Sequence, residues 1–453
     1  MSDEKIEKEK TDFNRRTFIG AAAALGAGAV LASCKKSYTP LTFTDSAPDG
    51  PVLKAGLIGC GERGTGAALQ FLRAGPNLKL VALADVLPDH LAECRANLAK
   101  KAQVQIADDH CFLGFDAYKK VLDTDVDVVL LTTPPHFRPQ HFDAAVDAKK
   151  HCFIEKPCAV DAPGARSVLA TGQKAAAYNL SVLAGTQRRH DRTYRETYNR
   201  VSHGAIGQIV GAYTRCNVGM EWYLEKKPGW SDMEAMIRDW TNWCWLSGDH
   251  IVEFHVHNLD ALLWFTGMSP VKALGAGGRY QRVTGDDFDF FNVQFTYPSG
   301  AVIDSMARVM DGCANEVSEY VVGTEGYASC KNTIYDLKGN VVWKYQEPGQ
   351  APGKSKFNSY DQEHIDFVTA IRTNQPINEA EHLATSTLTA VMGRTAVYTG
   401  KLVTLDEIME SNERLGPTEY AMGPSPLIKA AVPVPGSKAN IAKNSRETWT
   451  YKE

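Results

Sequence analysis

The chain has 453 residues, of which 49 are basic and 53 acidic, so its formal net charge at pH 7 is -4. This near-neutral balance provides no basic patch of the kind that binds nucleic acid, and it excludes that class of function. Hydrophobic residues make up 44% of the chain. Together with the length, this content predicts two sizeable globular domains.

The amino-terminal segment has the pattern of an export signal. The stretch NRRTFIG, at residues 14–20, places paired arginines before the apolar run AAAALGAGAVLAS, which is short for a membrane span. This order resembles a twin-arginine signal, and LASC resembles a lipoprotein processing box that makes Cys34 the lipidated first residue. We expect a signal over 1–34, a tether over 35–51, and a periplasmic or membrane-anchored lipoprotein. The alternative is a frayed amphipathic tail.

The other nine cysteines are expected to be free and mostly buried. Their number is odd, and they show no paired framework. A twin-arginine substrate folds in the reducing cytoplasm before export, which disfavours disulfides. The positions are 60, 94, 111, 152, 158, 216, 244, 313 and 330.

Residues 52–75 predict a nucleotide-binding turn. They read VLKAGLIGCGERGTGAALQFLRAG, an apolar strand followed by a glycine-rich turn and a helix. Gly59, Gly61 and Gly64 have the G-x-G-x-x-G spacing. The first glycine permits the tight turn, the second lets a pyrophosphate approach the backbone, and the third lets helix and strand pack closely.

A second apolar stretch, LKLVALADV, contains Asp85, about 20 residues past the last glycine of the loop. A carboxylate at this place binds the ribose 2′-hydroxyl and repels a 2′-phosphate, so NAD is expected rather than NADP. NADP stays possible, because Arg63 in the loop offers a compensating positive charge. The alternative for Asp85 is a cap at the end of the strand.

Two further apolar strands follow, in VDVVLLTTPP at 126–135 and KHCFIEKP at 150–157, with a helix containing His141 between them. Strands that alternate with helices predict a doubly wound parallel sheet, which binds ligands at the carboxyl ends of its strands. The expected cofactor-binding residues are Gly59, Gly61, Glu62, Arg63, Gly64, Asp85, Thr132, Thr133, Pro134, His136, Glu155 and Lys156.

This succession of motifs resembles the Gfo/Idh/MocA family, the glucose-fructose oxidoreductase and inositol dehydrogenase group. The likeness runs from about Val52 to about Leu405. Besides the motifs above, it includes QRRHDRTYRETYNRVSHGAIGQI at 187–209, a helix with HNLD, and DQEHIDFVTAIRTNQP at 361–376. The ordered combination is far more specific than any single motif.

The resemblance implies an α/β protein with two domains. A Rossmann domain over 52–175 is followed by a substrate-binding and oligomerisation domain over 176–405, which has an open, largely antiparallel sheet. A carboxy-terminal extension occupies 406–453. The resemblance also implies a homo-oligomer and places Lys156 between the nicotinamide and the substrate.

The stretch GDHIVEFHVHNLD, at 248–260, concentrates polar side chains. At about 100° per residue, a helical wheel aligns His250, Glu253, His257 and Asp260 in one stripe. His255 falls on the apolar side, where a hydrogen-bonded core histidine is expected. The family often has an aspartate four residues before the histidine that answers to His257, whereas this chain has Glu253.

Hydride transfer from a secondary alcohol needs a base for the hydroxyl proton, whereas the cofactor supplies the hydride chemistry. His257, with an ordinary pKa of about 6.5, is expected to be that base, since the charges of NAD⁺ and Lys156 favour its neutral form. Lys156 is expected to orient the substrate or relay the proton. Glu253 either orients the imidazole, binds a substrate hydroxyl or is a solvated charge on the helix.

The sugar site is expected to include Gln187 and Arg188, with His190 beside them, although these residues also suit a rim. Trp240, Trp243 and Trp245 would stack on a sugar face or belong to the core. A metal held by His250, Glu253 and His257 is the alternative for the polar stripe. We expect no metal, since hydride transfer beside a lysine needs none.

Three functions are weighed. The first is an NAD-dependent oxidoreductase acting on a sugar, glycoside or cyclitol hydroxyl, with NAD held tightly because the exported protein leaves the cytoplasmic pool. The second is an NAD-dependent glycoside hydrolase that oxidises its sugar transiently, although the tyrosine-proline-threonine-histidine-glycine run that we associate with that branch is absent. The third is a sugar-binding lipoprotein without catalysis, which the intact glycines, Asp85, Lys156 and His257 disfavour.

Overall fold

A computed structural model describes residues 41–436 except 221 and 348–356. The expected export signal, Cys34 and the first part of the tether lie outside the described residues, as does the end of the carboxy-terminal extension. Among the helices of the described residues, none combines the length and the apolar character needed to cross a bilayer.

The first half of the chain forms a six-stranded parallel sheet with the order β3-β2-β1-β4-β5-β6. This arrangement confirms the doubly wound sheet, and the strand order reverses between β1 and β4, where such sheets bind ligands. The strands are β1 (Leu53–Ile58), β2 (Leu78–Asp85), β3 (Cys111–Leu113), β4 (Val128–Leu131), β5 (His151–Ile154) and β6 (Val182–Ala184). The helices are α2 (Glu62–Arg73), α3 (Pro88–Ala102), α4 (Ala117–Leu122), α5 (Arg138–Asp147) and α6 (Ala162–Ala177).

The central strands are buried on both faces. In β4 all four residues, VVLL, are buried, and alternate residues join two different clusters: Leu130 packs with Leu57, whereas Leu131 packs with Ile58. An apolar run without alternation is typical of a parallel sheet covered by helices on both sides. The sheet continues through β6 to Ala184, beyond residue 175, where the sequence places the end of the first domain. A strand of three residues is too short to give a clear sequence signal.

The second half forms a nine-stranded sheet in which every neighbouring pair is antiparallel except β7 and β10. This confirms the largely antiparallel sheet. Its order is β14-β13-β12-β11-β7-β10-β9-β8-β15. The strands are β7 (Ile209–Val218), β8 (Lys272–Gly278), β9 (Phe290–Thr296), β10 (Val302–Val309), β11 (Glu316–Gly323), β12 (Gly326–Ser329), β13 (Thr333–Asp336), β14 (Val341–Lys344) and β15 (Val403–Thr404).

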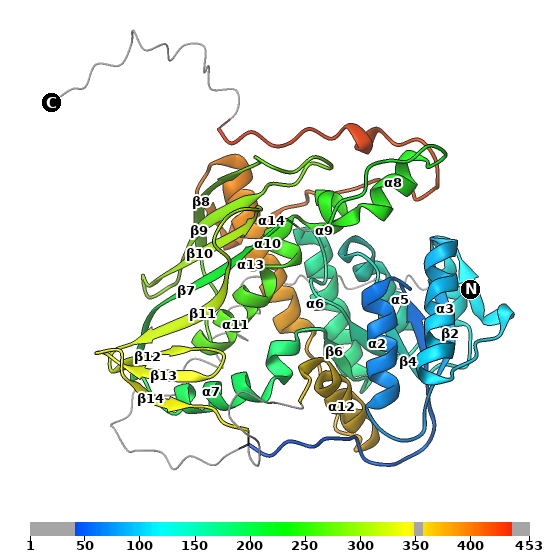
Figure 1. The fold of residues 1–453 in the computed structure, drawn as a ribbon, viewed down its shortest axis with the longest axis horizontal. Coiled ribbons are helices and arrows are strands. Elements are labelled where there is room, and N and C mark those ends of the chain that lie inside the picture. The colour runs from blue at the N-terminus through cyan, green and yellow to red at the C-terminus, as the bar shows by residue number, and fades with distance from the viewer. Residues whose placement is uncertain (1–40, 221, 348–356, 437–453) are drawn as a thin grey trace, which may run out of the picture.

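Helices cover one face of the second sheet (Figure 1). The helices on this face are α10 (His250–Glu253), α11 (Val256–Thr266), α13 (Ala380–Thr399) and α14 (Leu405–Glu410), and the other helices of the second half are α7 (Arg192–Ser202), α8 (Asp232–Arg238), α9 (Cys244–Ser247) and α12 (Ser359–Arg372). The 3-10 turns are η1 (Asp108–His110), η2 (Pro135–Phe137), η3 (Gln187–His190), η4 (Trp240–Asn242) and η5 (Pro426–Lys429). In β9 exposed and buried residues alternate, as expected for a sheet with one covered face.

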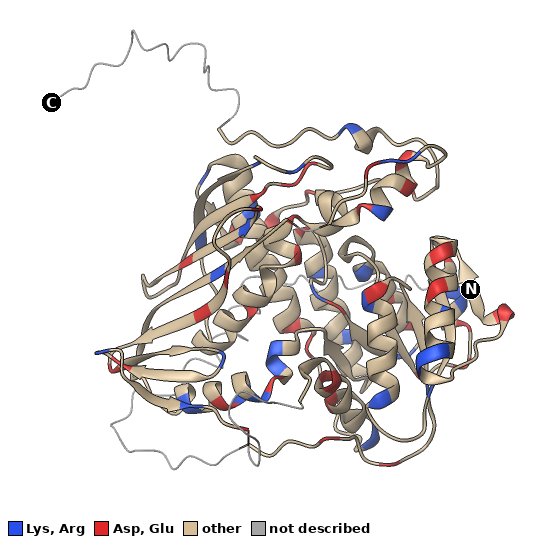
Figure 2. Ribbon diagram, viewed as in Figure 1, with Lys and Arg blue, Asp and Glu red and all other residues tan. Residues whose placement is uncertain are grey.

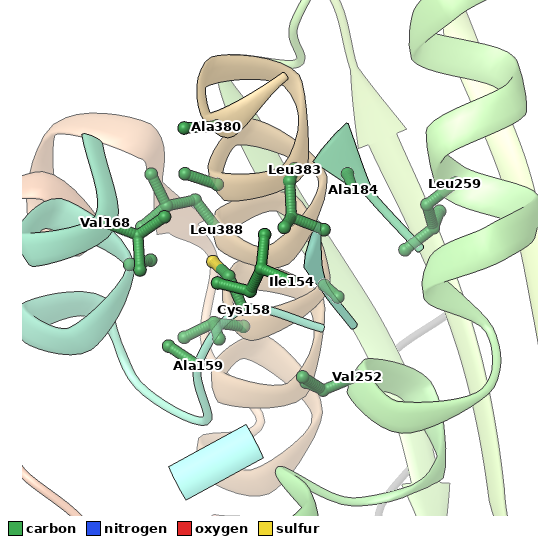
Figure 3. Packing of buried hydrophobic residues seen from close by; sticks show 14 of the residues in the cluster. Ile154, Cys158, Ala159, Val168, Ala184, Val252, Leu259, Ala380, Leu383 and Leu388 are labelled. Carbon is green, nitrogen blue, oxygen red and sulfur yellow. The ribbon is translucent and has the colours of Figure 1, made fainter. Parts of the chain in front are cut away.

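The late helices join the two halves. Helix α13 packs against both α6 and β8, and α12 packs against α2. Figure 3 shows the shared core, in which Val168 of α6, Leu388 of α13 and Ile154 of β5 gather in one cluster that also includes Leu259 of α11. Residues 359–399, which lie between β14 and β15 of the second sheet in the chain, therefore also cover the first domain.

The segment after α14 runs back across the molecule, as the red ribbon in Figure 1 shows. It packs with α8, α9 and loops of the first domain in an apolar cluster that includes Leu87, Phe137 and Trp245, with Leu415 and Tyr420 against it. This segment therefore borders the carboxyl end of the parallel sheet.

The distribution of charged residues and the state of the cysteines agree with the predictions from the sequence. Acidic and basic residues are interspersed over both halves of the ribbon in Figure 2. Every cysteine within the described residues is free, and only Cys313 is exposed. The prediction of free, mostly buried thiols is confirmed for these nine positions.

Candidate active site

The glycine-rich turn lies between β1 and α2. Gly59 has φ +100°, and a Cβ there would lie 2.6 Å from the backbone nitrogen of Thr133. A Cβ on Gly64 would lie 1.9 Å from the carbonyl oxygen of Gly59, so only glycine lets α2 approach the turn this closely. Gly61, by contrast, faces open space. It precedes α2 without a capping side chain, which leaves the amino-terminal N–H groups of the helix for an anion such as a pyrophosphate.

Asp85 ends β2 beside this turn. Its carboxylate accepts hydrogen bonds from the backbone nitrogens of Cys60, at 2.6 Å, and Leu87, at 2.8 Å. Burial raises the pKa of Asp85, although these two hydrogen bonds oppose the rise. The cap at the strand end is therefore present, and it fixes the carboxylate at the edge of the nucleotide crevice. Each oxygen retains a second lone pair with which to accept a ribose hydroxyl.

Arg63 points away from Asp85. Its guanidinium pairs with Glu155 and, at 3.2 Å, with Glu363, and it lies 5.0 Å from the ring centroid of Tyr360. The positive charge of Arg63, which the sequence suggests as a partner for the 2′-phosphate of NADP, is therefore already paired with Glu155 and Glu363. Sequence analysis missed Glu363 and Tyr360, since both lie on α12, about 300 residues further along the chain.

The other predicted residues at the carboxyl ends of the parallel strands contact neighbouring side chains or backbone. Thr132 donates its hydroxyl to the carbonyl oxygen of Gly59 at 2.7 Å, which braces the turn. His136 shares a 2.8 Å hydrogen bond with the hydroxyl of Tyr420, and burial lowers its pKa to about 4. His136 is thus a neutral side chain beneath the carboxy-terminal segment. Thr133 lies 3.3 Å from His141, Pro134 precedes η2, and Glu62 is exposed.

Glu155 is a buried anion beside Lys156. Burial opposes its ionisation, but the positive charges of Arg63, Arg138 and Lys156 outweigh this effect and lower its pKa. A Cβ on Gly185 would lie 2.6 Å from the Glu155 carboxylate, so this glycine makes room for it. Sequence analysis missed Arg138, which is 4% exposed.

Lys156 bridges the two domains. Its Nζ donates to the Glu253 carbonyl oxygen at 2.6 Å and to the Glu253 carboxylate at 2.9 Å. The two side chains are 13% and 7% exposed. Burial raises the pKa of Glu253, although the charges of Lys156 and Arg138 oppose the rise. The interpretation of Glu253 as a solvated helix charge is therefore wrong, and its ion-pair partner is Lys156 rather than a histidine.

The expected continuous helix over 248–260 is interrupted. Helix α10 ends at Glu253 and α11 begins at Val256, because the amide nitrogens of Phe254 and His255 both donate to the carbonyl oxygen of His250 and end the first helix. The prediction of one unbroken helix is therefore wrong, although the charge of Lys156 acts on His250, Glu253 and His257 alike.

The residues of that stripe have different partners. His250 lies 3.4 Å from the carbonyl oxygen of Cys216, and Asp260 forms two hydrogen bonds with Arg189. His255 shares a 2.7 Å hydrogen bond with Ser305 in the core, as predicted. Throughout the described chain, no three His, Cys, Asp or Glu side chains are grouped to hold a metal ion.

His257 follows the break, at the start of α11. Its Nδ1 atom is buried and has no hydrogen-bond partner within the described residues. Burial lowers the pKa of His257 well below its usual range, and the positive charges of Lys156, Arg188 and Arg63 lower it further. The imidazole is therefore neutral at physiological pH and has a free nitrogen among cations from both domains.

The predicted sugar-site residues divide into two groups. Gln187 donates to the hydroxyl of Tyr360 at 3.0 Å, and Arg188 pairs with the buried Glu319 of β11, which sequence analysis missed. His190 instead lies 2.8 Å from Asp366 and 3.6 Å from Glu379. Although burial opposes protonation, these carboxylates raise the pKa of His190 to about 10, so it is a charged structural link.

The tryptophans favour the core interpretation. Trp243 and Trp245 are 7% and 4% exposed, and both belong to the apolar cluster beneath the carboxy-terminal segment. Trp240 packs against the same cluster while remaining partly exposed. Two of the three are thus buried away from any sugar face.

Comparisons with known proteins agree with this geometry. Residues 53–182 match the model of the Gfo/Idh/MocA family described as an oxidoreductase family with an NAD-binding Rossmann fold, and residues 194–329 match the Gfo/Idh/MocA C-terminal domain. An uncharacterised oxidoreductase of Bacillus subtilis, YrbE, is 23% identical over 331 residues, covering 71% of this chain and 86% of that protein.

Two further relatives have names that indicate activities. Inositol 2-dehydrogenase of Salmonella typhimurium is 30% identical over 163 residues, which cover 36% of this chain and 45% of that protein. Glycosyl hydrolase family 109 protein 1 of Bacteroides fragilis is 26% identical over 333 residues, or 69% of this chain and 70% of that protein.

Solved structures share the fold. The scyllo-inositol dehydrogenase of Lactobacillus casei with bound NAD(H) and scyllo-inositol has a TM-score of 0.58 at 20% identity, covering 78% of this chain and 99% of that one. An oxidoreductase domain protein of Kribbella flavida has a TM-score of 0.65 at 19% identity, covering 79% and 100%.

Proposed function

Since this chain belongs to the Gfo/Idh/MocA family of NAD-binding oxidoreductases, we propose that it transfers hydride between NAD and a hydroxyl of a sugar, glycoside or cyclitol. The observation that carries this proposal is the pairing of two groups. Lys156 is held in place by Glu253, and its positive charge, with those of Arg188 and Arg63, helps to keep the imidazole of His257 neutral. A cationic donor and an uncharged imidazole base beside a nucleotide crevice match the needs of alcohol oxidation.

The nucleotide half suits NAD. Gly61 leaves open space before an uncapped helix terminus, where a pyrophosphate would bind, and Asp85 presents a fixed carboxylate for the ribose. Because Arg63 is paired to Glu155 and Glu363, its charge is not available to offset the repulsion between Asp85 and a 2′-phosphate. When bound, NAD supplies the hydride acceptor.

The chain's own residues then move the proton. His257 accepts the proton of the substrate hydroxyl on its free ring nitrogen, which a low pKa keeps unprotonated before the reaction. Lys156 donates a hydrogen bond to the same oxygen and stabilises the charge that develops there. Glu253 holds the ammonium group in place, so its role is to position Lys156 rather than the imidazole. Gln187 and Arg188 border the substrate side.

The direct experiment incubates the purified protein with inositols, aldoses and aryl glycosides and follows keto-sugar, free aglycone and bound ligand separately. Oxidation that disappears in His257→Ala supports the proposal. Binding of a sugar without any oxidation, in protein that contains NAD, would contradict it and favour a non-catalytic binding protein.

Hydrolysis by transient oxidation is the second candidate. The relative named as a family 109 glycosyl hydrolase favours it, because the similarity spans both domains. In this chain the same Lys156 and His257 would serve the oxidation and the later reduction. Release of aglycone with no net accumulation of keto-sugar would establish this candidate in place of the first.

We also propose export through the twin-arginine route with lipidation at Cys34, and a tightly held NAD that is regenerated within the active site. Support for retention comes from α8, whose Arg238 forms two hydrogen bonds with Asp89, at 2.7 and 2.9 Å, just beyond Asp85. Quantifying the nucleotide released on denaturing the mature protein tests retention. Less than stoichiometric NAD, with activity that depends on added NAD, would contradict it.

We further propose that the open sheet face joins subunits in a homo-oligomer. Apolar side chains such as Leu274, Phe290 and Val302 are exposed on β8, β9 and β10. Exposed apolar side chains on a sheet face are of the kind that subunit interfaces bury. Sedimentation analysis of the mature protein tests this proposal, and a monomer at micromolar concentration would contradict it.

A further inference from the structure

A second pocket lies apart from Lys156, Glu253 and His257. It has a volume of about 200 Å³ and is formed by the start of α6, the end of α13, α14 and the segment that follows α14. None of those three residues lines it. The volume is below the roughly 300 Å³ at which pockets begin to hold drug-sized ligands, so it suits a small metabolite.

Arg394 of α13 lines this pocket and is only 5% exposed. One terminal nitrogen of its guanidinium donates to the carbonyl oxygens of Val160, at 2.7 Å, and Gly248, at 3.0 Å. Its Nε and second terminal nitrogen form no hydrogen bond within the described chain. These two groups form the edge of a guanidinium that binds a carboxylate through two parallel hydrogen bonds.

Three carboxylates line the pocket, of which Glu413 is exposed at the rim and the other two are engaged locally. Asp161 accepts hydrogen bonds from the backbone nitrogens of Gly164, at 2.8 Å, and Leu415, at 2.9 Å. Glu407 accepts from the backbone and hydroxyl of Thr404, at 2.7 and 2.9 Å. Asp161 and Glu407 thus cap helix amino termini, and they have further lone pairs with which to accept hydrogen bonds from hydroxyl groups.

The remaining wall is mixed. Thr395 donates its hydroxyl to the carbonyl oxygen of Val391 and keeps lone pairs available to an incoming hydroxyl. Lys401 lies at the exposed rim and adds a second positive charge, whereas Ile408 and Val391 provide apolar surface. The pocket thus combines a guanidinium that can bind an anion with several oxygen atoms that can accept hydrogen bonds from hydroxyl groups.

We propose that this pocket binds a small hydroxy carboxylate, of the size of a six-carbon sugar acid. The carboxylate pairs with the free edge of Arg394, and the hydroxyl groups donate to Asp161, Glu407 and Thr395. The same guanidinium holds Val160, four residues after Lys156, and Gly248, five residues before Glu253, so the ligand contacts a side chain that ties both active-site loops together. This inference goes beyond the proposed function and does not depend on it.

Calorimetric titration of the purified protein with D-gluconate tests the proposal, with D-sorbitol as the neutral ligand of the same carbon chain. Saturable binding of gluconate and at least about tenfold weaker binding of sorbitol are expected, since a charge-assisted bidentate pair is lost. Equal binding of the two ligands, or no binding of gluconate at tens of millimolar, would overturn the carboxylate assignment.

Variants locate the site. Thr395→Phe fills the pocket and is expected to weaken gluconate binding at least about tenfold. Thr385→Phe is the matched control, because Thr385 is also partly exposed on α13 and donates to the carbonyl oxygen four residues earlier, outside the pocket. Thr399→Glu, at an exposed lining position, adds a repelling charge and serves if the filled variant does not fold. Unchanged gluconate affinity in a folded pocket variant would overturn the proposal, and this readout needs neither NAD nor turnover.

Discussion

The nucleotide half and the substrate half of the active site are built differently. In the nucleotide half, Gly59, Gly64 and Asp85 lie within one strand-turn-helix-strand unit, and their contacts follow directly from sequence spacing. Where the substrate half begins, Lys156 of the first domain bonds to Glu253 of the second across 97 residues of sequence. Local spacing therefore predicts where a cofactor binds, whereas the catalytic partnerships depend on how two domains meet.

The largest effect is expected at the junction of the two halves. Lys156→Ala and His257→Ala should each reduce turnover at least about a hundredfold, since general acid-base groups typically contribute that much or more. NAD binding should stay near wild type, because the glycine turn and Asp85 are unchanged, whereas Lys156→Ala leaves the buried Glu253 without its partner and should also lower the thermal stability. Lys100→Ala and His203→Ala, which change exposed residues of the same types, are the controls. A variant with nearly full kcat would remove that residue from the mechanism.

A smaller effect is expected from the residue that positions Lys156. Glu253→Gln keeps the shape of the side chain and an acceptor oxygen but removes the charge, so kcat should fall about tenfold, within the worth of a charged hydrogen bond. KM should change little if Glu253 does not touch the substrate. A large rise in KM with unchanged kcat would instead show that Glu253 binds a substrate hydroxyl.

A substitution in the nucleotide half should weaken the binding of NAD without lowering the rate of the chemical step. Asp85→Ala removes the ribose acceptor and the acceptor of the Cys60 N–H bond, so NAD should bind about tenfold more weakly, and the preference over NADP should narrow. Fluorescence titration with both nucleotides measures this. An unchanged preference would mean that another residue reads the ribose.

The smallest effect on catalysis is expected at His190, which links η3 to α12 and α13. Its folded pKa of about 10 lies above the ordinary value of about 6.5, so its ion pairs with Asp366 and Glu379 stabilise the fold fully below pH 6.5. That stabilisation is lost as pH rises through about 10. Thermal unfolding between pH 6 and 10 should show a steeper loss in wild type than in His190→Gln. Parallel profiles would contradict the charged state.

Several features of the fold follow from the sequence. The glycine spacing, the acid at the end of β2 and the uninterrupted apolar run of β4 predict the parallel nucleotide-binding sheet, because each signal acts over a few residues. The alternation in β9 agrees with the largely antiparallel sheet that the family resemblance implies. His255 as a hydrogen-bonded core histidine also followed from its place on the apolar side of a helix.

Other features were decided only by the tertiary structure. The packing of the two domains brought Glu253 to Lys156, and the return of α12 to the first domain brought Glu363 to Arg63. The physical reason is that sequence periodicity specifies which face of an element is buried, but not which distant side chain lies against it. A buried charge needs a partner, and only the packed chain determines which one supplies it.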